Sequence, residues 1–275
     1  MPLASDRCIC LRKTEYSETS QILTLLSREQ GIVRVVAKGA HRRTKAGASR
    51  FDGGIDILDL GHAVFSGDTS RELSILTDWK LQDGNLSLRK NLRALYLAIY
   101  AAELLGLVLE EHDPHPEVFD LMHRLLPELS TASIEESFLA FELDLLREAG
   151  FMPELAACVG CANRVGDRDG ISFSPARGGI LCGKCSTTAT ASDRIPLDVR
   201  LLRLMQMIQS PAPRRLPRLT RHQTDPINRL LLQHIEHSLG RRPRSAYYIL
   251  AQMMAKPSAG RPSPQFACNS TGPGA

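Results

Sequence analysis

Four cysteines in the second half of the chain constrain its fold more than any other feature. They form the pattern C-x2-C-x20-C-x2-C and are Cys158, Cys161, Cys182 and Cys185. Two such knuckles at this spacing match a structural zinc site, in which four thiolates surround one ion at about 2.3 Å per Zn–S bond. Gly160 and Gly183 lie inside the knuckles, where we expect unusual backbone angles to cost a glycine little. We predict one structural Zn2+ as the cofactor; two disulfides or four unrelated cysteines are the alternatives.

The segment between the knuckles predicts a hairpin. Residues 171–174 and 180–181 are apolar or small and are separated by the turn-forming run PARGG at residues 175–179. A four-cysteine site leaves no open coordination position, so it indicates scaffolding and argues against metal catalysis.

Length and composition indicate a globular protein without a membrane span. The 275 residues suggest about two domains, and 43% of them are hydrophobic. The start of the chain lacks the long apolar core of a secretory signal. The most apolar stretch, residues 95–109, contains Glu103 and is too short to cross a bilayer. We therefore expect a cytoplasmic protein with no membrane partner and with its remaining cysteines reduced.

Charge is unevenly distributed along the chain. Residues 1–80 have a net charge of +2, residues 81–157 of −9 and residues 158–275 of +11. Such segregation indicates a polyanionic partner for the basic parts, although a solvated surface is the alternative.

The N-terminal part has the pattern of a small β-barrel. A strand begins at residues 8–11, residues 20–26 and 32–37 form a hairpin, and residues 55–65 and 73–79 supply two more strands. Five short strands in such a length suit an OB-fold, a barrel that is common in nucleic-acid-binding proteins. The predicted fold class is α+β: a five-stranded OB-fold barrel followed by a helical domain that carries the four-cysteine zinc hairpin.

Helical periodicity begins near residue 90. We predict helices over residues 91–111, 114–129, 133–149, 197–209, 226–239 and 244–254. Asp113-Pro114 is expected to begin the second helix, and Ser133 with Glu136 is expected to cap the third. The predicted domains are the barrel (1–80), a helical domain in two parts (81–157 and 192–255), the zinc hairpin inserted between them (158–191), and a disordered tail (256–275) rich in Pro, Gly and Ser.

A basic loop follows the predicted hairpin of the barrel. Residues 38–47 (KGAHRRTKAG) contain no acid, and loops of this kind between barrel strands can follow a phosphate backbone. Since exposed aromatic candidates are scarce, we expect contact with the backbone and not base reading. A solubilising loop is the alternative. The predicted DNA-binding residues are Arg12, Lys13, Arg34, Lys38, Arg42, Arg43 and Lys45.

The sequence offers no catalytic constellation. It contains neither G-x-x-x-x-G-K-[ST] nor G-x-G-x-x-G, the two phosphate-binding fingerprints. Glu142, Asp144 and Glu148 share a predicted helix, and we interpret them as a solvated face. We therefore predict that the protein is not an enzyme.

Several segments together resemble the RecO family of bacterial DNA repair and recombination proteins. They are residues 11–20 (LRKTEYSETS), 25–31 (LLSREQG), 35–40 (VVAKGA) and, between the knuckles, residues 173–175 with 178–179 and 181–182. The order of barrel, helices, zinc hairpin and helices extends the resemblance over nearly all of residues 1–255.

The resemblance implies a mediator that binds single- and double-stranded DNA and anneals complementary strands. It also implies RecR as a partner, and help in loading RecA onto DNA covered by single-stranded-DNA-binding protein through the acidic C-terminal tail of that protein. We expect the tail to bind outside the barrel; the stripe Leu201, Leu202, Met205 and Ile208 is a candidate, with core packing as its alternative. Two other functions stay open: a zinc-ribbon RNA-binding protein of the ribosome or transcription machinery, and a metal-dependent hydrolase or nuclease.

Overall fold

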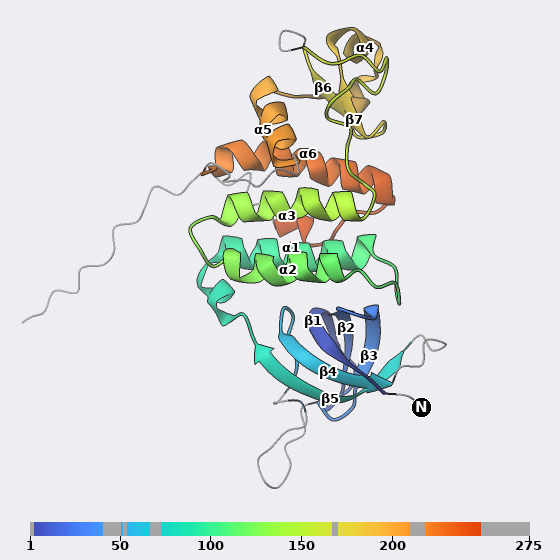
Figure 1. Ribbon diagram of the computed structural model, residues 1–275, viewed down its shortest axis with the longest axis vertical. Helices are drawn as coiled ribbons and strands as arrows, with labels where there is room; N and C mark the ends of the chain where they lie inside the picture. Colours follow the sequence, from blue (N-terminus) through green and yellow to red (C-terminus); the bar gives the residue numbers. More distant parts are fainter. Residues whose placement is uncertain are drawn as a thin grey trace, which may run out of the picture.

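The N-terminal part folds into a closed five-stranded barrel with the strand order β1-β2-β3-β5-β4. The computed structural model describes residues 3–40, 51, 54–66, 73–166, 170–209 and 218–248. The strands are β1 (Leu3–Glu15), β2 (Gln21–Ser27), β3 (Gly31–Ala37), β4 (Leu60–Ser66) and β5 (Ser74–Asp83). Neighbouring strands are antiparallel except β3 and β5, which are parallel. This arrangement confirms the predicted OB-like barrel (Figure 1).

Strand β1 contributes to two separate cores. Cys8 and Cys10 point into the barrel, whereas Ile9 and Leu11 pack with the helices. A bulge then shifts the pairing between Cys10 and Arg12. A bulge adds one residue to the alternation of inward and outward side chains. The side chains of Leu11 and Arg12 therefore both point to the outside of the barrel.

The predicted strand over residues 55–65 is too long at its start. Residues 55–59 instead form a turn, in which the Asp56 backbone N–H donates to the Asp59 carboxylate at 2.7 Å and the Ile57 N–H donates to the Asp56 carboxylate at 2.9 Å. Aspartates favour such local bonds over a strand ladder, which explains the difference. The strand begins only at Leu60.

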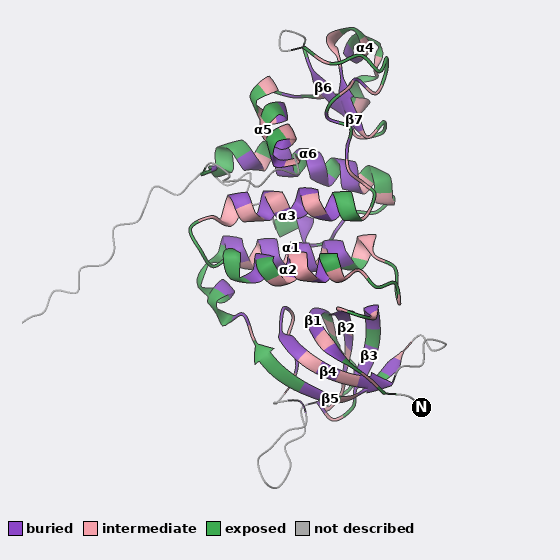
Figure 2. Ribbon diagram, viewed as in Figure 1, coloured by how far each residue is buried: buried purple, intermediate pink, exposed green. Residues whose placement is uncertain are grey.

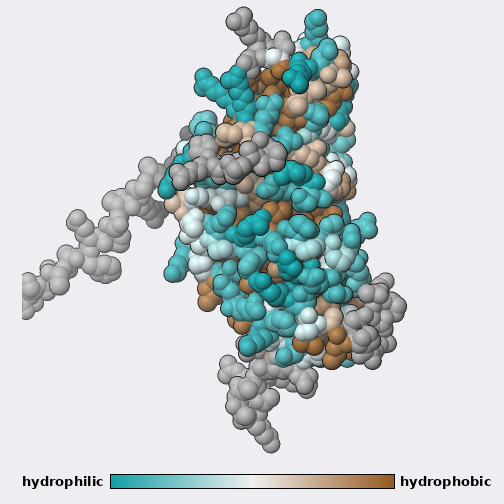
Figure 3. All heavy atoms as spheres, in the orientation of Figure 1, coloured by the Kyte–Doolittle hydropathy of each residue, from teal (hydrophilic) through white to brown (hydrophobic). Residues whose placement is uncertain are grey.

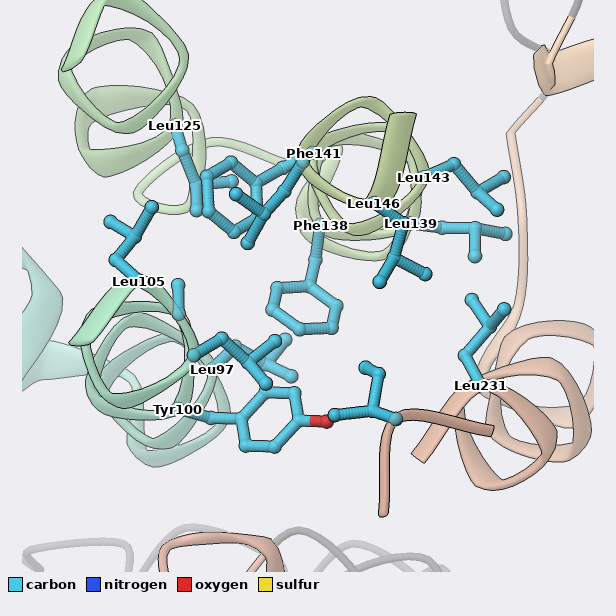
Figure 4. Close-up of a cluster of buried hydrophobic side chains, with 14 of the residues drawn as sticks. Leu97, Tyr100, Leu105, Leu125, Phe138, Leu139, Phe141, Leu143, Leu146 and Leu231 are labelled. Carbon is cyan, nitrogen blue, oxygen red and sulfur yellow. The ribbon is translucent and has the colours of Figure 1, made fainter. Parts of the chain in front are cut away.

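In the described part of the chain, five main helices stack above the barrel (Figure 1). They are α1 (Leu92–Val108), α2 (Pro116–Glu128), α3 (Ile134–Glu148), α5 (Val199–Gln209) and α6 (Arg221–Leu239); the short 3-10 helix η1 (Leu86–Lys90) precedes them. Side chains from α1, α2, α3 and α6 meet in one core, which Figure 4 shows around Phe138. Barrel residues such as Ile9, Leu26 and Ile32 belong to the same cluster, so barrel and helices are packed together.

Helix α2 begins at Pro116 and not at Pro114, so the predicted start is wrong. The preceding segment is held against the barrel: Glu111 pairs with Ile32 in a parallel bridge, and the His112 N–H donates to the Ile32 carbonyl at 3.0 Å. This tertiary pairing keeps the segment extended.

The predicted cap of α3 is also wrong, because Ser133 makes no side-chain cap bond. The nearby glutamates have other partners: Glu135 accepts from Arg93 on α1, and Glu136 accepts from the Leu219 backbone. A capping box occurs instead at Thr220, where α6 begins five residues before the predicted Pro226. Gly150, with φ of +75°, follows the end of α3 in the left-handed conformation that favours glycine.

The segment between α3 and α5 is a small unit with its own sheet. It contains β6 (Ser172–Ser174), β7 (Gly179–Leu181), the short helix α4 (Gly183–Thr188), the 3-10 turn η2 (Ala191–Asp193) and β8 (Ile195–Pro196). Strands β6 and β7 pair antiparallel, which confirms the predicted hairpin, and β8 adds a third strand beside β6.

Burial follows these layers (Figure 2). The barrel interior and the helix interfaces are buried, whereas the last residues of β5 are exposed. The face drawn in Figure 3 is largely hydrophilic over the helices. Among the described residues, no helix is both long and apolar enough to cross a membrane. Most of the predicted helix over residues 244–254 and the tail from residue 256 lie outside the described residues.

Candidate metal centre and nucleic-acid interface

The four predicted cysteines converge on one point. The Sγ atoms of Cys158, Cys161, Cys182 and Cys185 all lie within 4.8 Å of one another. The Cys161 and Cys182 sulfurs are 3.8 Å apart, far longer than the S–S bond of about 2.05 Å in a disulfide. Tetrahedral coordination at about 2.3 Å per bond places sulfurs about 3.8 Å apart. All four cysteines are free thiols in the structure, so the cluster fits a metal ion and not two disulfides.

The first knuckle is closed by backbone hydrogen bonds. The Cys158 N–H donates to the Asn163 carbonyl at 2.9 Å, and the Ala162 N–H donates to the Cys158 carbonyl at 2.7 Å. The left-handed residue of this loop is Ala162, with φ of +60°; Gly160 and Gly183 have no such angle, so that expectation is wrong. Gly160 is needed for space, because a Cβ atom there would lie 3.0 Å from the Cys185 sulfur.

The backbone around Cys158 favours its thiolate. Burial opposes ionisation, but N–H groups of Cys182, Gly160 and Cys161 point at the sulfur and lower the pKa of Cys158 to about 6. Hydrogen bonding among the sulfurs acts the other way on Cys185 and raises its pKa. A divalent cation stabilises all four thiolates together, because its charge outweighs their mutual repulsion.

The metal centre is attached to the helical core through its hairpin. Phe173 of β6 is fully buried and makes an edge-on contact with the His234 ring of α6, with centroids 5.8 Å apart. The His234 Nε2 atom lies 2.7 Å from the Phe151 carbonyl, just beyond α3. Burial lowers the pKa of His234, which therefore packs as a neutral ring. The hairpin thus joins the end of α3 to the middle of α6.

Two of the predicted DNA-binding residues form a row across the barrel. Arg12 on β1 pairs with Thr24 on β2, and Thr24 pairs with Arg34 on β3. Directly opposed residues point to the same side of a sheet, and three adjacent strands span about 10 Å. Arg12 and Arg34 are exposed. We call Arg12, Thr24 and Arg34 the basic row.

The structure separates Lys13 from this row. Lys13 pairs with Leu23, which is fully buried inside the barrel, and its Nζ atom lies 3.0 Å from the Asp56 carboxylate. Lys38 is exposed just after β3. Arg42, Arg43 and Lys45 lie outside the described residues. Among the described residues, the Arg34 guanidinium lies 3.9 Å from the Glu111 carboxylate, which is a weak ion pair.

Aromatic rings at the described barrel surface are few. Phe51, Phe65 and Trp79 are buried in the barrel core, whereas Tyr16 is exposed. The basic row can therefore attract a phosphate backbone, but most of the barrel's rings cannot reach a base.

A groove between α5 and the start of α6 was only partly anticipated. Leu202, Met205 and Ile208 of the predicted stripe are core residues, as the alternative interpretation held. The neighbouring face of α5 lines a groove of about 570 Å³. Its lining is Asp198, Arg200, Leu201, Arg203, Leu204, Met207, Arg218, Leu219, His222, Gln223 and Pro226. An apolar floor with three arginines beside it suits an acidic peptide; only the three-dimensional arrangement shows which face of α5 is free.

Comparisons with known proteins cover both parts of the fold. Residues 1–85 match the family model described as Recombination protein O N terminal, and residues 89–246 match Recombination protein O C terminal. The chain is 31% identical to DNA repair protein RecO of Myxococcus xanthus (strain DK1622) over 245 residues, which is 89% of this chain and 96% of the relative.

Two further relatives agree. DNA repair protein RecO of Anaeromyxobacter dehalogenans (strain 2CP-C) is 36% identical over 179 residues, 65% of this chain and 68% of the relative. The protein of the same name from Symbiobacterium thermophilum is 33% identical over 193 residues, 69% of this chain and 74% of the relative. Barrel and helical domain are thus each matched by their own family model, and the chain belongs to the RecO family of DNA repair proteins.

Proposed function

We propose that this protein is a non-enzymatic mediator of DNA repair and homologous recombination. In this proposal it binds single- and double-stranded DNA, anneals complementary strands, and helps load RecA onto single strands covered by single-stranded-DNA-binding protein, in the cytoplasm. The observation that carries the proposal is the exposed basic row on an OB-like barrel in a chain of a DNA repair family. Family membership favours this function over the zinc-ribbon RNA-binding and hydrolase alternatives.

DNA binding is proposed to be electrostatic. Neutralising about four to six phosphates of a single strand makes log K fall against log salt with a slope of roughly −3 to −4. Replacing both arginines of the basic row by alanine should flatten that slope by about 1 to 1.4, since each phosphate on a single strand accounts for about 0.7. By the same reasoning, replacing Arg42, Arg43 and Lys45 together by alanine should flatten the slope by up to about 2.

The measurement is fluorescence anisotropy of a labelled single strand at several salt concentrations. Lys13→Ala is the matched control, because Lys13 is already paired with Asp56 and does not lie in the row. An unchanged slope in Arg12→Ala/Arg34→Ala would move the DNA site away from the basic row.

Annealing is proposed to need no nucleotide. A protein that neutralises two strands lowers their mutual repulsion, so that base pairing supplies the driving force. Annealing should therefore proceed without ATP and should slow in the basic-row double variant. Dependence on ATP would contradict the proposal.

Zinc is proposed to be structural and bound by the four cysteines. Its role is to fix the two knuckles, and through β6 to hold the end of α3 against α6. Metal analysis should find one zinc per chain. A purified protein that folds and binds DNA normally after complete metal removal would overturn this role.

The acidic tail of single-stranded-DNA-binding protein is proposed to bind in the groove between α5 and α6. Arg200 and Arg218 would meet its carboxylates, and Leu201, Leu204 and Met207 offer an apolar floor for its last side chain. RecR is a further proposed partner, for which a pull-down with purified RecR is the test.

Tail binding and DNA binding should be separable. Arg200→Ala/Arg218→Ala should lower the affinity for a labelled peptide that copies the acidic tail and leave the affinity for DNA unchanged. Arg12→Ala/Arg34→Ala should lower the affinity for DNA and leave the affinity for the peptide unchanged. Equal loss of both affinities in either double variant would show one shared basic surface.

A further inference from the structure

Three tyrosines form a cluster on the helical domain, in which Tyr96 is half-buried and Tyr247 and Tyr248 are exposed. Tyr96 of α1 stacks on Tyr248, with ring centroids 5.2 Å apart and planes inclined by 16°. Tyr247 meets Tyr248 edge to face at 5.8 Å. Tyr247 is 72% exposed and Tyr248 is 51% exposed. We call Tyr96, Tyr247 and Tyr248 the tyrosine platform.

The platform is anchored to α1. Glu103, two turns after Tyr96, accepts hydrogen bonds from the Arg244 and Ser245 backbone N–H groups at 2.7 Å each. A helical turn then carries the two tyrosines, because the Tyr248 N–H donates to the Ser245 carbonyl at 3.0 Å. The rings are therefore fixed before any ligand arrives, so little conformational entropy is lost on binding.

An apolar side chain and an arginine lie near the platform, in addition to the Glu103 carboxylate that anchors it. Leu92 lies one turn before Tyr96 on α1 and is 58% exposed. Arg244 is exposed and lies three positions before Tyr247, on the same turn. Exposed rings next to an arginine are the combination on which unpaired bases stack while a phosphate is attracted nearby.

We propose that the tyrosine platform stacks bases of single-stranded DNA. This inference rests on the proposed function and supplies what the barrel lacks: among the described barrel residues only Tyr16 is an exposed ring. Stacking uses the face of a base and leaves its pairing edge free. A strand held on the platform can therefore still meet its complement, which suits annealing. A duplex keeps its bases stacked on one another and gains nothing from the platform.

The test compares two single-stranded oligomers of equal length, oligo(dT) and one in which central nucleotides are abasic. Both carry the same phosphates, so they differ only in the bases. Wild-type protein should bind oligo(dT) roughly tenfold more tightly, since one stacked base typically accounts for a change of this order. Tyr247→Ala should remove most of this difference. It should leave the abasic oligomer, a duplex and the salt slope unchanged.

Two variants make the result specific. Tyr247→Trp keeps a ring at a mostly exposed position and should retain the preference for bases. Leu3→Ala removes another exposed apolar side chain, at the start of the barrel, and should change nothing. The proposal is overturned if wild type binds both oligomers equally. It is also overturned if Tyr247→Ala weakens the binding of both oligomers equally, or if that variant binds DNA as wild type does and has lost only the binding of a partner protein.

The outcomes also separate this inference from the proposed function. If wild type binds both oligomers equally and in a salt-dependent way, base stacking on the platform is rejected and the proposed DNA-binding function is retained. If wild type binds neither oligomer, both the stacking proposal and the proposed DNA-binding function are rejected.

Discussion

The Glu142 carboxyl group is fully buried in the helical core, although its sequence neighbours predicted a solvated face. Its Oε1 atom accepts from the Tyr100 hydroxyl at 3.3 Å, and its Oε2 atom has no partner among the described residues. Figure 4 shows Tyr100 of α1 in this core, close to Phe138 of α3. Desolvation raises the pKa of Glu142 from 4.5 to about 8, and the single bond from Tyr100 offsets little of that rise. Glu142 is therefore protonated in the folded protein at neutral pH.

The raised pKa makes folding depend on pH. Below pH 4.5 the group is neutral in both states; between 4.5 and about 8 the unfolded chain releases a proton that the folded protein keeps. The free energy of unfolding then falls by about 1.4 kcal/mol per pH unit, and it levels off above the folded pKa. Glu142→Gln keeps the shape and removes the charge. Its stability relative to wild type should rise by about 2.7 kcal/mol between roughly pH 5.5 and 7.5.

The assay is urea unfolding of both proteins, followed by circular dichroism at several pH values. Glu148→Gln is the matched control, because Glu148 is exposed on the same helix and should show no such trend. Infrared spectra at neutral pH should contain a protonated-carboxyl band that Glu142→Gln removes. A constant stability difference across this pH range would refute the reasoning, because the carboxyl group would then ionise in the folded protein as it does in water.

Three further changes test other contacts. Gly31→Ala should lower the free energy of unfolding by more than the roughly 1–2 kcal/mol that a left-handed alanine costs. The reason is that φ is +69° and the new Cβ would lie 2.1 Å from a carbonyl oxygen of the α1–α2 connection. Urea unfolding measures the loss, and an unchanged stability would contradict this close contact between barrel and helices. Gly160→Ala should weaken zinc binding about tenfold in chelator competition by displacing Cys185, whereas Gly183→Ala, with its nearest atoms at 3.5 Å, should not. Arg93→Met should cost about 3–5 kcal/mol of unfolding free energy, because it leaves the partly buried Glu135 carboxylate without its cation and Asp225 with the longer Arg221 contact at 3.7 Å. A loss below about 1 kcal/mol would show that other partners compensate for Arg93.

Sequence reasoning succeeded where the signal was local. The cysteine spacing predicted that four sulfurs meet at one site that could hold a metal ion, because each knuckle of four residues fixes its own geometry. The turn-rich segment between them predicted the β6–β7 hairpin. Alternating apolar residues predicted the barrel strands, because one face of each strand must be buried.

Sequence reasoning failed where a residue contacts a segment that is distant in the sequence. Asp113 did not begin α2, because its segment lies against Gly31 and Ile32 of the barrel. Ser133 did not form a capping box, because Glu136 accepts from the Leu219 backbone far along the chain. The burial of Glu142 was missed because acidic residues on a helix usually face solvent. The helical period was a usable signal, since Phe138 and Leu146 lie four residues to either side and place Glu142 on the apolar face of α3.

The bulge in β1 shows how one local irregularity sets both the packing of a strand and the position of its charged side chain. Without it, strict alternation would turn the side chain after Leu11 into the barrel, where an arginine would have to be desolvated. With it, Ile9 and Leu11 pack with the helices, and Arg12 comes out on the solvent side in line with Thr24 and Arg34. The basic row and the junction between barrel and helices are thus fixed by the same strand. DNA bound at the row, as we propose, would therefore be held in a defined orientation to the helical domain, where the groove and the tyrosine platform lie.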